Sequence, residues 1–400
     1  MGPGLYNSGM KIAIVGASGA GLYLALFIKK NHPEFAVTLF DKNEKIGRKL
    51  LATGNGHANV LNMKTGPEHF NHPSFVAPYL NYYPFGECQG QLASEGIVLK
   101  NDGDLLYPLS FSAPSYVSFL GKLLKKEGVE IKLGVKVSDY VAKENVTLHT
   151  DKGEETFDFV VFATGGCSQA KLGSDGSLFP VFKKHGYKVV EPRPGLCPIR
   201  TVEKTKALSG QRHEAKVTVT IKGIVAREEE GEVLFKDDGL SGIVIFNIAS
   251  FINHLDDQQD VSIYLDLFPK VTLTALTMDL FASMKTNPDF FMDAYLTEPL
   301  KEYILRYAGV RLDGKVDKGV CFKIAKVMKQ LPFRFKETYG FDNSQVTIGG
   351  ISVENVGEKL RSKIENNVAF AGEVLDVDGL CGGHNLTWCL VSALAIAESF

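Results

Sequence analysis

The chain has 400 residues, of which 44% are hydrophobic and 22% are charged. A chain of this length and apolar content can bury large cores, and we expect two or three domains. The formal net charge is −2 and the two signs are interspersed, so the sequence indicates no basic face of the kind that binds nucleic acid or a membrane. The 40 glycines favour an α/β protein with many tight turns over a helical bundle.

The N-terminus and the cysteines bear on processing and location. Residues 1–9 (MGPGLYNSG) are interpreted as an expression scar, with Met10 as the native start. The six cysteines form no Cys-x-x-Cys pair, which argues against a redox disulfide, a zinc site or an iron–sulfur cluster. We find no signal peptide, and the apolar run 22–28 is too short to span a bilayer. We therefore expect a cytoplasmic protein with no metal and no membrane partner.

The first elements predict a βαβ unit. Residues 11–15 are a continuous apolar run typical of a buried parallel strand, residues 22–30 indicate a helix, and residues 36–40 indicate a second strand. A polar, glycine-rich loop follows over 47–56. Further on, the pattern predicts a helix over 114–126 and strands over 129–133 and 157–163.

The pattern changes near residue 190. The runs 217–221, 232–235 and 243–246 are short and β-like with glycine turns between them, which indicates an antiparallel sheet or a small barrel. Residues 271–331 are predicted to form helices. Strand signals return after residue 345, and a last helix is expected over 385–398. The organisation predicts one discontinuous α/β domain interrupted by a β insertion and a helical insertion.

Residues 16–21 (GASGAG) stand between a strand and a helix, where a dinucleotide fingerprint is expected. The helix N-terminus offers free N–H groups to a pyrophosphate, although Ser18 replaces the usual middle glycine. Asp41 lies 20 residues after Gly21 and suits the two hydroxyls of an adenosine ribose. The alternatives are an ordinary strand–helix turn and a surface acid. The two features together predict a dinucleotide site.

Other glycine-rich segments favour FAD over NAD. The backbone of 47–56, with Arg48 and Lys49, can line a pyrophosphate or an isoalloxazine edge, the alternative being a solvated loop. Residues 163–166 (ATGG) let backbone approach a ligand. Glu373 ends the last strand, where it suits ribityl hydroxyls. Residues 382–385 (GGHN) open the last helix, whose dipole stabilises negative charge on a reduced flavin. The two ends of the chain are thus predicted to close on one FAD.

In combination these segments resemble the aminoacetone oxidase family of three-domain bacterial flavoproteins, whose FAD domain is similar to that of glutathione reductase-type enzymes. The matching segments are 47–56 (GRKLLATGNG), 163–166, 231–235 (GEVLF) with 239–242 (GLSG), and 371–379 (AGEVLDVDG) with 382–385. The resemblance implies a Rossmann-like FAD-binding domain over 10–189 and 345–400. It also implies a β-rich substrate domain over 190–253 and 330–344 and a helical domain over 254–329. The chain departs from the family at 56–59 (GHAN for Gly-Arg-Cys-Asn) and at His384, where tyrosine is common.

Site residues follow from these segments. His384 and Tyr107 are candidates for the substrate pocket, the alternative for His384 being a packing or capping role. No catalytic base is predicted. The residues expected to bind FAD are Gly16, Ser18, Gly19, Ala20, Gly21, Asp41, Lys42, Arg48, Lys49, Thr53, Gly54, Asn55, Gly56, Asn59, Val137, Ala163, Thr164, Gly165, Gly372, Glu373, Asp378, Gly383, His384, Asn385 and Leu386.

Two enzymatic functions stay open. The first is an FAD-dependent oxidase of a small primary amine, for which the resemblance implies aminoacetone and O2 as partners and methylglyoxal, ammonia and hydrogen peroxide as products. The second is a reductase that takes hydride from NAD(P)H and reduces a conjugated or sterol-like substrate. Residues 190–330 carry no second dinucleotide fingerprint, which favours the oxidase. A flavin-binding protein that associates with RNA is a third hypothesis, which the near-neutral charge supports little.

Overall fold

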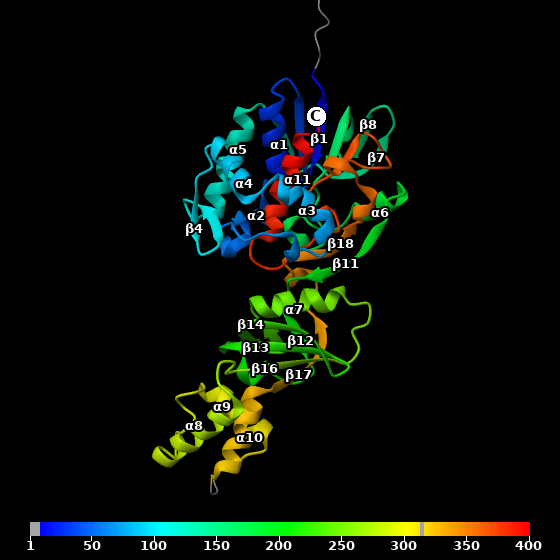
Figure 1. Ribbon diagram of the computed structural model, residues 1–400. Coiled ribbons are helices and arrows are strands. Elements are labelled where there is room, and N and C mark those ends of the chain that lie inside the picture. The colour runs from blue at the N-terminus through cyan, green and yellow to red at the C-terminus, as the bar shows by residue number, and fades with distance from the viewer. Residues whose placement is uncertain (1–8, 313–315) are drawn as a thin grey trace, which may run out of the picture. The chain divides into compact units, whose positions relative to one another are not determined.

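The structure, a computed structural model, describes residues 9–312 and 316–400. Residues 1–8, which hold most of the predicted expression scar, lie outside the described residues. The chain divides into two compact units: the part up to Pro194 with Gln345–Phe400, and Gly195–Ser344 (Figure 1). Each unit has its own buried apolar core. A further division of the second unit into a β-rich and a helical domain stays a prediction.

The first unit is built on a five-stranded parallel sheet with the order β19-β10-β1-β2-β6. Its strands are β1 (Lys11–Val15), β2 (Ala36–Asp41), β6 (Glu130–Leu133), β10 (Phe159–Phe162) and β19 (Val368–Phe370). The central strand β1 pairs with β2 on one side and β10 on the other, and its residues 12–15 are apolar because both faces of the sheet are covered. Strand β19 pairs with β10, so the C-terminal part of the chain completes the sheet.

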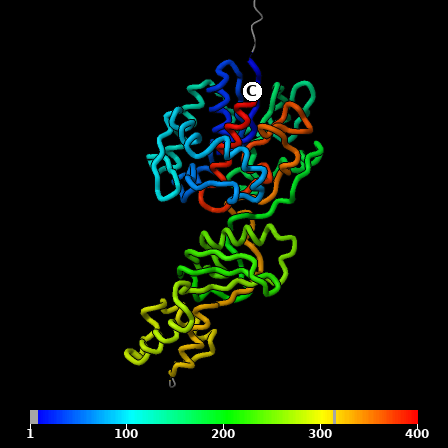
Figure 2. Tube along the Cα trace, in the orientation of Figure 1, coloured from blue at the N-terminus to red at the C-terminus, as the bar shows by residue number. Residues whose placement is uncertain are grey.

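The first and last helices of the chain pack against each other in this unit (Figure 2). They are α1 (Gly19–Asn31) and α11 (His384–Ala397). Helix α1 is buried from Gly19 to Lys29, as expected of a helix covered on all sides. Helix α5 (Ala113–Lys126) also contacts α1, and the side chain of Ser112 caps its N-terminus. The three helices predicted here are confirmed, with slightly different bounds.

The remaining elements of the first unit surround this sheet. The helices are α2 (Arg48–Leu51), α3 (Pro73–Tyr82), α4 (Phe85–Ser94) and α6 (Phe179–Lys184). One small sheet has the strands β3 (Leu61–Asn62), β5 (Leu105–Pro108) and β4 (Leu99–Asp102), and another has β7 (Val137–Ala142), β8 (Val146–Thr150) and β9 (Gly153–Phe157). Strands β11 (Val189–Gly195) and β18 (Val346–Ile351) form a two-stranded sheet. The prediction of a loop over 47–56 was wrong. Gly47, at φ 66°, is the N-cap residue of α2, and a 3-10 turn (Thr53–Gly56) follows the helix.

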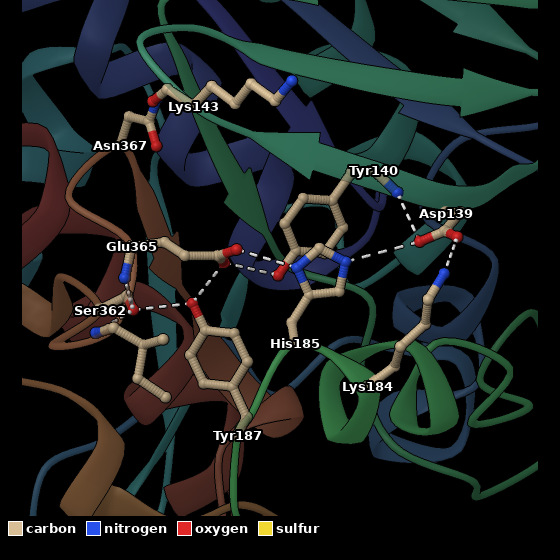
Figure 3. A network of polar contacts seen from close by, with 10 residues as sticks. Asp139, Tyr140, Lys143, Lys184, His185, Tyr187, Ser362, Glu365 and Asn367 are labelled. Carbon is tan, nitrogen blue, oxygen red and sulfur yellow. Dashed lines mark hydrogen bonds and ion pairs between the residues drawn. The ribbon is translucent and has the colours of Figure 1, made fainter.

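A polar network ties β7 to the segment that enters β19 (Figure 3). Glu365 accepts hydrogen bonds of 2.8 Å from the hydroxyls of Tyr140 and Tyr187, and it lies 2.8 Å from His185 Nδ1. The hydroxyl of Ser362 accepts from the backbone N–H of Glu365 at 3.0 Å. Because Glu365 comes three residues before β19, the network positions the start of that strand.

The second unit contains a closed barrel of antiparallel pairs, in the order β12-β15-β14-β13-β16-β17. Its strands are β12 (Ile199–Thr201), β13 (Arg212–Ile221), β14 (Ile224–Lys236), β15 (Gly239–Ser241), β16 (Val261–Asp266) and β17 (Leu331–Thr338). Alternate residues of β13 (Ala215, Val217 and Val219) are buried, which is the period of a strand with one face in a core. The predicted small barrel is confirmed.

The expected strand over 243–246 was wrong, because these residues open helix α7 (Ile243–His254). Four apolar residues in a row do not distinguish a strand from a buried helix. The residues that follow decide it, since Val244, Ile245, Ile248 and Ile252 are all buried at spacings of three and four. The helices expected over 271–331 are confirmed as α8 (Leu273–Thr286), α9 (Glu298–Ala308) and α10 (Lys318–Lys329).

Candidate flavin site

The turn between β1 and α1 depends on two glycines. Gly16 has a φ of 112°, and a Cβ there would lie 2.3 Å from the carbonyl oxygen of Ala163. A Cβ on Gly21 would lie 1.8 Å from the carbonyl oxygen of Gly16. The turn therefore closes only with glycine at both positions. Gly19 differs, because its Cβ would meet only side-chain atoms, at 3.5 Å or more.

The N-terminus of α1 suits a phosphate. The first intrahelical hydrogen bond runs from the N–H of Leu22 to the carbonyl oxygen of Ser18 at 2.9 Å, so the N–H groups of the first turn have no acceptor within the helix. Ser18 is the N-cap residue in an extended conformation, and its side chain makes no capping bond. The first turn holds no acidic residue that would repel an anion.

Asp41 holds this turn from the end of β2. Its Oδ2 accepts from the N–H of Ala17 at 2.8 Å, and its Oδ1 accepts from the backbone N–H and the side-chain Nδ2 of Asn43. The carbonyl oxygen of Asp41 accepts from the N–H of Val135 at 3.0 Å, which brings the chain leading to Val137 alongside. Oδ2, which accepts only one of these bonds, keeps acceptor capacity for a ribose hydroxyl, whereas Oδ1 already accepts two.

The basic residues of the first segments point to different partners. Nη1 of Arg48 donates to Oδ1 of Asn43 at 3.0 Å, close to Asp41. Nζ of Lys49 instead lies 2.8 Å from Oε2 of Glu373, and Nζ of Lys42 lies 2.6 Å from Oδ1 of Asp175. The two cations of the 47–56 segment thus contact two separate parts of the candidate site, Arg48 near Asp41 and Lys49 at Glu373.

Glu373 joins the C-terminal segment to the strand end at residues 163–166. Its Oε1 accepts from the N–H of Thr347 at 2.8 Å, and the hydroxyl of Thr347 accepts from the N–H of Cys167 at 2.7 Å. Gly165 and Gly372 both have positive φ, of 68° and 71°. The carboxylate predicted to face ribityl hydroxyls is thus already paired with Lys49 and Thr347, and its role toward FAD stays a prediction.

Asn59 lies between two glycine turns from distant parts of the chain. A Cβ on Gly54 would lie 3.3 Å from its Oδ1, and a Cβ on Gly383 would lie 3.4 Å from its Nδ2. Leu105 and Tyr107, two residues apart on β5, contact the same turns, Leu105 at Gly383 and Tyr107 at Gly54. The structure therefore brings both predicted pocket residues, Tyr107 and His384, next to this glycine-lined region.

His384 is the first residue of α11, and its ring is held on two sides. Its Nδ1 lies 3.0 Å from the hydroxyl of Thr65, and its ring stacks on that of His69 with 4.1 Å between centroids. The side chain is 5% exposed. Burial, with a smaller effect of His69, lowers the pKa of His384 to about 4, so the imidazole is neutral near pH 7.

Two polar groups of this region have no protein partner. Among the described residues, neither Nε2 of His384 nor the hydroxyl of Tyr107 makes a hydrogen bond, although the Tyr107 side chain is only 9% exposed. Burial, together with the charge of Asp102, raises the pKa of Tyr107, which keeps its phenol protonated. Neither of these two atoms is fully buried, so a bound ligand can reach both of them.

The turn before α11 is closed by amide side chains. Asn385 accepts from the N–H of Gly379 at 2.8 Å and donates to its carbonyl oxygen at 2.9 Å. Asn71 accepts from the N–H of Asp378 at 3.1 Å, and His72 Nε2 lies 3.0 Å from Asp376 Oδ2. These contacts are structural, as is the hydrogen bond of 2.6 Å that Nδ2 of Asn62 donates to the carbonyl oxygen of Gly382.

The predicted FAD residues all belong to the first unit. The hydroxyl of Thr53 bonds the carbonyl oxygen of Leu50 at 2.7 Å and so shapes α2. Asn43, Asn62, Thr65 and His69 were missed. Asn43 carries a sequence signal, since an Asx side chain two residues after Asp41 indicates a turn. The other three have none, because only folding brings them to the C-terminal segment.

Residues 10–399 match the HI0933-like protein Rossmann domain family. The chain belongs to this family. As an HI0933-like protein it is an FAD-dependent oxidoreductase, and FAD is its cofactor. The site residues fit that cofactor, with an anion-suited helix terminus at α1, a carboxylate at the end of β2, and ligand-suited polar groups near Gly54 and Gly383.

The HI0933-like chain is similar over its length to two characterised relatives. It is 28% identical over 391 residues to the 3-dehydro-bile acid delta(4,6)-reductase of Clostridium scindens, covering 94% of this chain and 96% of the relative. It is 28% identical over 407 residues to the ribosomal RNA dihydrouridine synthase of Haemophilus influenzae, covering 96% and 97%. Its fold is similar to that of 3-ketosteroid delta1-dehydrogenase from Sterolibacterium denitrificans, with a TM-score of 0.53, 10% identity, and coverage of 98% and 99%.

The predictions of FAD and of an oxidoreductase are confirmed, whereas the aminoacetone oxidase assignment stays a prediction that these relatives do not support. Within 9–312 and 316–400, no cluster of three His, Cys, Asp or Glu side chains is arranged to hold a metal ion. No helix in the same residues has both the length and the apolar character needed to cross a membrane.

Proposed function

We propose that this protein reduces a carbon–carbon double bond conjugated with a carbonyl group in an apolar small molecule. The observation that carries the proposal is the pair of neutral donors beside the Gly54–Asn59–Gly383 contact, Tyr107 and His384. Both groups are uncharged near pH 7 and are suited to a carbonyl oxygen on which negative charge develops.

The named relatives support this class of reaction. A delta(4,6)-reductase acting on a 3-dehydro bile acid and a dihydrouridine synthase both saturate a double bond conjugated with a carbonyl group. When bound and reduced, FAD would supply a hydride, which carries both electrons of the reduction. The protein residues supply the rest: Tyr107 holds a proton at its hydroxyl, and His384 holds one on its imidazole.

The charges of the site favour this reaction over amine oxidation. A primary amine arrives as a cation near neutral pH, and an anionic side chain would be needed to hold it. Glu373, a carboxylate of the C-terminal segment, is already paired with Lys49. The net charge of −2 likewise favours a small molecule over RNA, because binding of a phosphate backbone depends on clustered basic residues.

The test uses the FAD-loaded protein under anaerobic conditions. The flavin is reduced with dithionite and then mixed with testosterone, an enone, or with dihydrotestosterone, its saturated counterpart. We expect testosterone alone to reoxidise the flavin, and we expect Tyr107→Phe to slow that step about 100-fold if the phenol supplies the proton. NADH and NADPH are tested separately as reductants.

Three other outcomes have defined meanings. Bleaching of the oxidised flavin by aminoacetone, without reoxidation by testosterone, would replace the proposal with the amine oxidase. Reoxidation only by ribosomal RNA that lacks dihydrouridine would move the substrate to RNA. A reduced flavin that none of these substrates reoxidises would overturn double-bond reduction.

A further inference from the structure

The hydroxyl of Thr65 and the ring of His384 form a contact between segments 319 residues apart. Thr65 follows β3, and its backbone N–H donates to the carbonyl oxygen of Asn62 at 3.2 Å. Asn62 in turn donates from Nδ2 to the carbonyl oxygen of Gly382 at 2.6 Å. The turn that carries Thr65 is thus tied to the same segment that carries His384, so their relative position is set by three hydrogen bonds.

The direction of the Thr65–His384 hydrogen bond follows from the acceptor strengths. A threonine hydroxyl both donates and accepts, while one nitrogen of a neutral imidazole donates and the other accepts. An imidazole nitrogen is more basic than a hydroxyl oxygen, so the stronger bond has the hydroxyl donating to Nδ1. The proton of the neutral ring then lies on Nε2.

Nε2 is the atom that this arrangement leaves for a ligand. Among the described residues it has no hydrogen-bond partner, and the side chain that carries it is 5% exposed. It lies 3.6 Å from the position that a Cβ on Gly382 would occupy, so the absence of a side chain at Gly382 leaves space beside it. Because Nε2 is not fully buried, a ligand acceptor can reach it and take the place of solvent there.

We propose that Thr65 is a positioning residue that keeps the proton on Nε2 of His384, and that Nε2–H donates a hydrogen bond to the carbonyl oxygen of the substrate. This inference rests on the proposed function, because it assigns His384 as the group that contacts the reacting carbonyl. It goes further, because it names Nε2 as the ring atom that contacts the substrate and Thr65 as the residue that keeps the proton on that atom.

The proposed reaction is a hydride transfer followed by protonation. A hydride from reduced FAD bonds to the β carbon, the double-bond electron pair moves toward the carbonyl, and the oxygen becomes an enolate oxygen. Nε2–H of His384 stabilises that charge and keeps its own proton. A proton from Tyr107 or water then bonds to the α carbon, and the carbonyl reforms. FAD is left oxidised and the double bond has gained two hydrogens.

A direct test is the tautomer of His384 in the FAD-loaded protein without substrate. Long-range nitrogen–proton NMR on protein labelled at histidine separates the two tautomers, and His384 is assigned by the signal that His384→Asn removes. We expect a neutral ring protonated on Nε2 at pH 7, with His69 and Glu68 as the titrating neighbours that act on it. Thr65→Ser should keep this tautomer, and Thr65→Val should lose it. A proton on Nδ1, or an unchanged spectrum in Thr65→Val, would overturn the proposal.

A second test uses nitrophenol as an oxyanion probe. If Nε2–H donates to an oxyanion, His384→Phe should weaken nitrophenolate binding about 10- to 100-fold, and His384→Gln should restore part of it through its amide N–H. Equal binding by wild type and His384→Phe would overturn the donor role. If both tests succeed while testosterone fails to reoxidise the flavin, only the proposed function fails, so the two failures are distinguishable.

Discussion

Nζ of Lys49 lies 2.8 Å from Oε2 of Glu373, although 324 residues separate them in the sequence. The two side chains are 17% and 15% exposed, so the pair is shielded from bulk water. Glu373 also accepts from the backbone of Thr347, which connects the pair to the strand end at residues 163–166. One contact thus joins three segments of the candidate flavin site, and its charge balance bears on both stability and cofactor binding.

We predict that Lys49→Met destabilises the protein by about 1–3 kcal/mol, because it leaves a shielded carboxylate with only one backbone donor. FAD affinity should fall as well, since Glu373 then loses its fixed position. Chemical denaturation and flavin titration measure the two effects. Lys126→Met is the matched control, because its pair with Glu127 is exposed and should contribute less than about 1 kcal/mol. Equal stability of the two variants would contradict the prediction.

The glycines of the first turn should separate folding from binding. Gly21→Ala should lower the free energy of unfolding by about 2 kcal/mol or more, because its Cβ would overlap a backbone oxygen that cannot move freely. Gly19→Ala should leave the free energy of unfolding nearly unchanged, because its Cβ would meet only side-chain atoms at ordinary contact distance. It should weaken FAD binding, because Gly19 lies at the N-terminus of α1, where the pyrophosphate is expected. The comparison needs thermal unfolding of the apoprotein and FAD titration. Equal stability of the two apoprotein variants would contradict the prediction that a side chain at position 21 overlaps the backbone of the turn.

His384 should make the protein less stable in mild acid. Its pKa is lowered to about 4 in the folded state, against about 6.5 in an unfolded chain, so the unfolded state binds more protons in between. Stability is therefore complete above pH 6.5 and falls as the pH drops toward 4, by about 3 kcal/mol at most. His384→Asn cannot titrate and should lose less stability over the same range. Urea unfolding of both proteins at several pH values is the measurement, and parallel pH profiles would refute the assignment.

Glu365 should be the residue on which the network of Figure 3 depends. Glu365→Gln replaces one acceptor oxygen by a donor, so at least one bond to Tyr140, Tyr187 or His185 is lost. We expect destabilisation of about 1–3 kcal/mol, because these partners are largely buried. Glu155→Gln, at the more exposed pair with Lys132, is the control and should cost less than about 1 kcal/mol.

The same network predicts a second acid-sensitive group. Burial opposes ionisation of Asp139, but hydrogen bonds from Lys184 and from the N–H of Tyr140 outweigh it and lower its pKa. The folded state therefore favours the carboxylate, and this contribution is present above the unfolded pKa and is lost as the pH falls through the folded one. Asp139→Asn should flatten the stability profile below about pH 4. A profile identical to that of wild type would show that Asp139 is not coupled to folding.

Much of the fold could be predicted where the local pattern and the tertiary environment agree. The runs 11–15 and 36–40 are apolar because the parallel sheet buries both faces, and such runs indicate strands without further context. The run 243–246 misled for the opposite reason: four apolar residues suit either state, and the helical period appears only in the residues that follow.

For the candidate site, the residue types and the turns could be predicted from local sequence alone. The spacing of Gly16, Gly21 and Asp41 indicated a dinucleotide, because close backbone packing and a strand-end carboxylate are local requirements. Three features appear only in the folded chain: Lys49 pairs with Glu373, Thr65 and His69 hold His384, and Asn59 lies between Gly54 and Gly383. Those contacts join segments hundreds of residues apart, and their energies depend on burial and orientation, which arise when the sheet brings the two ends of the chain together.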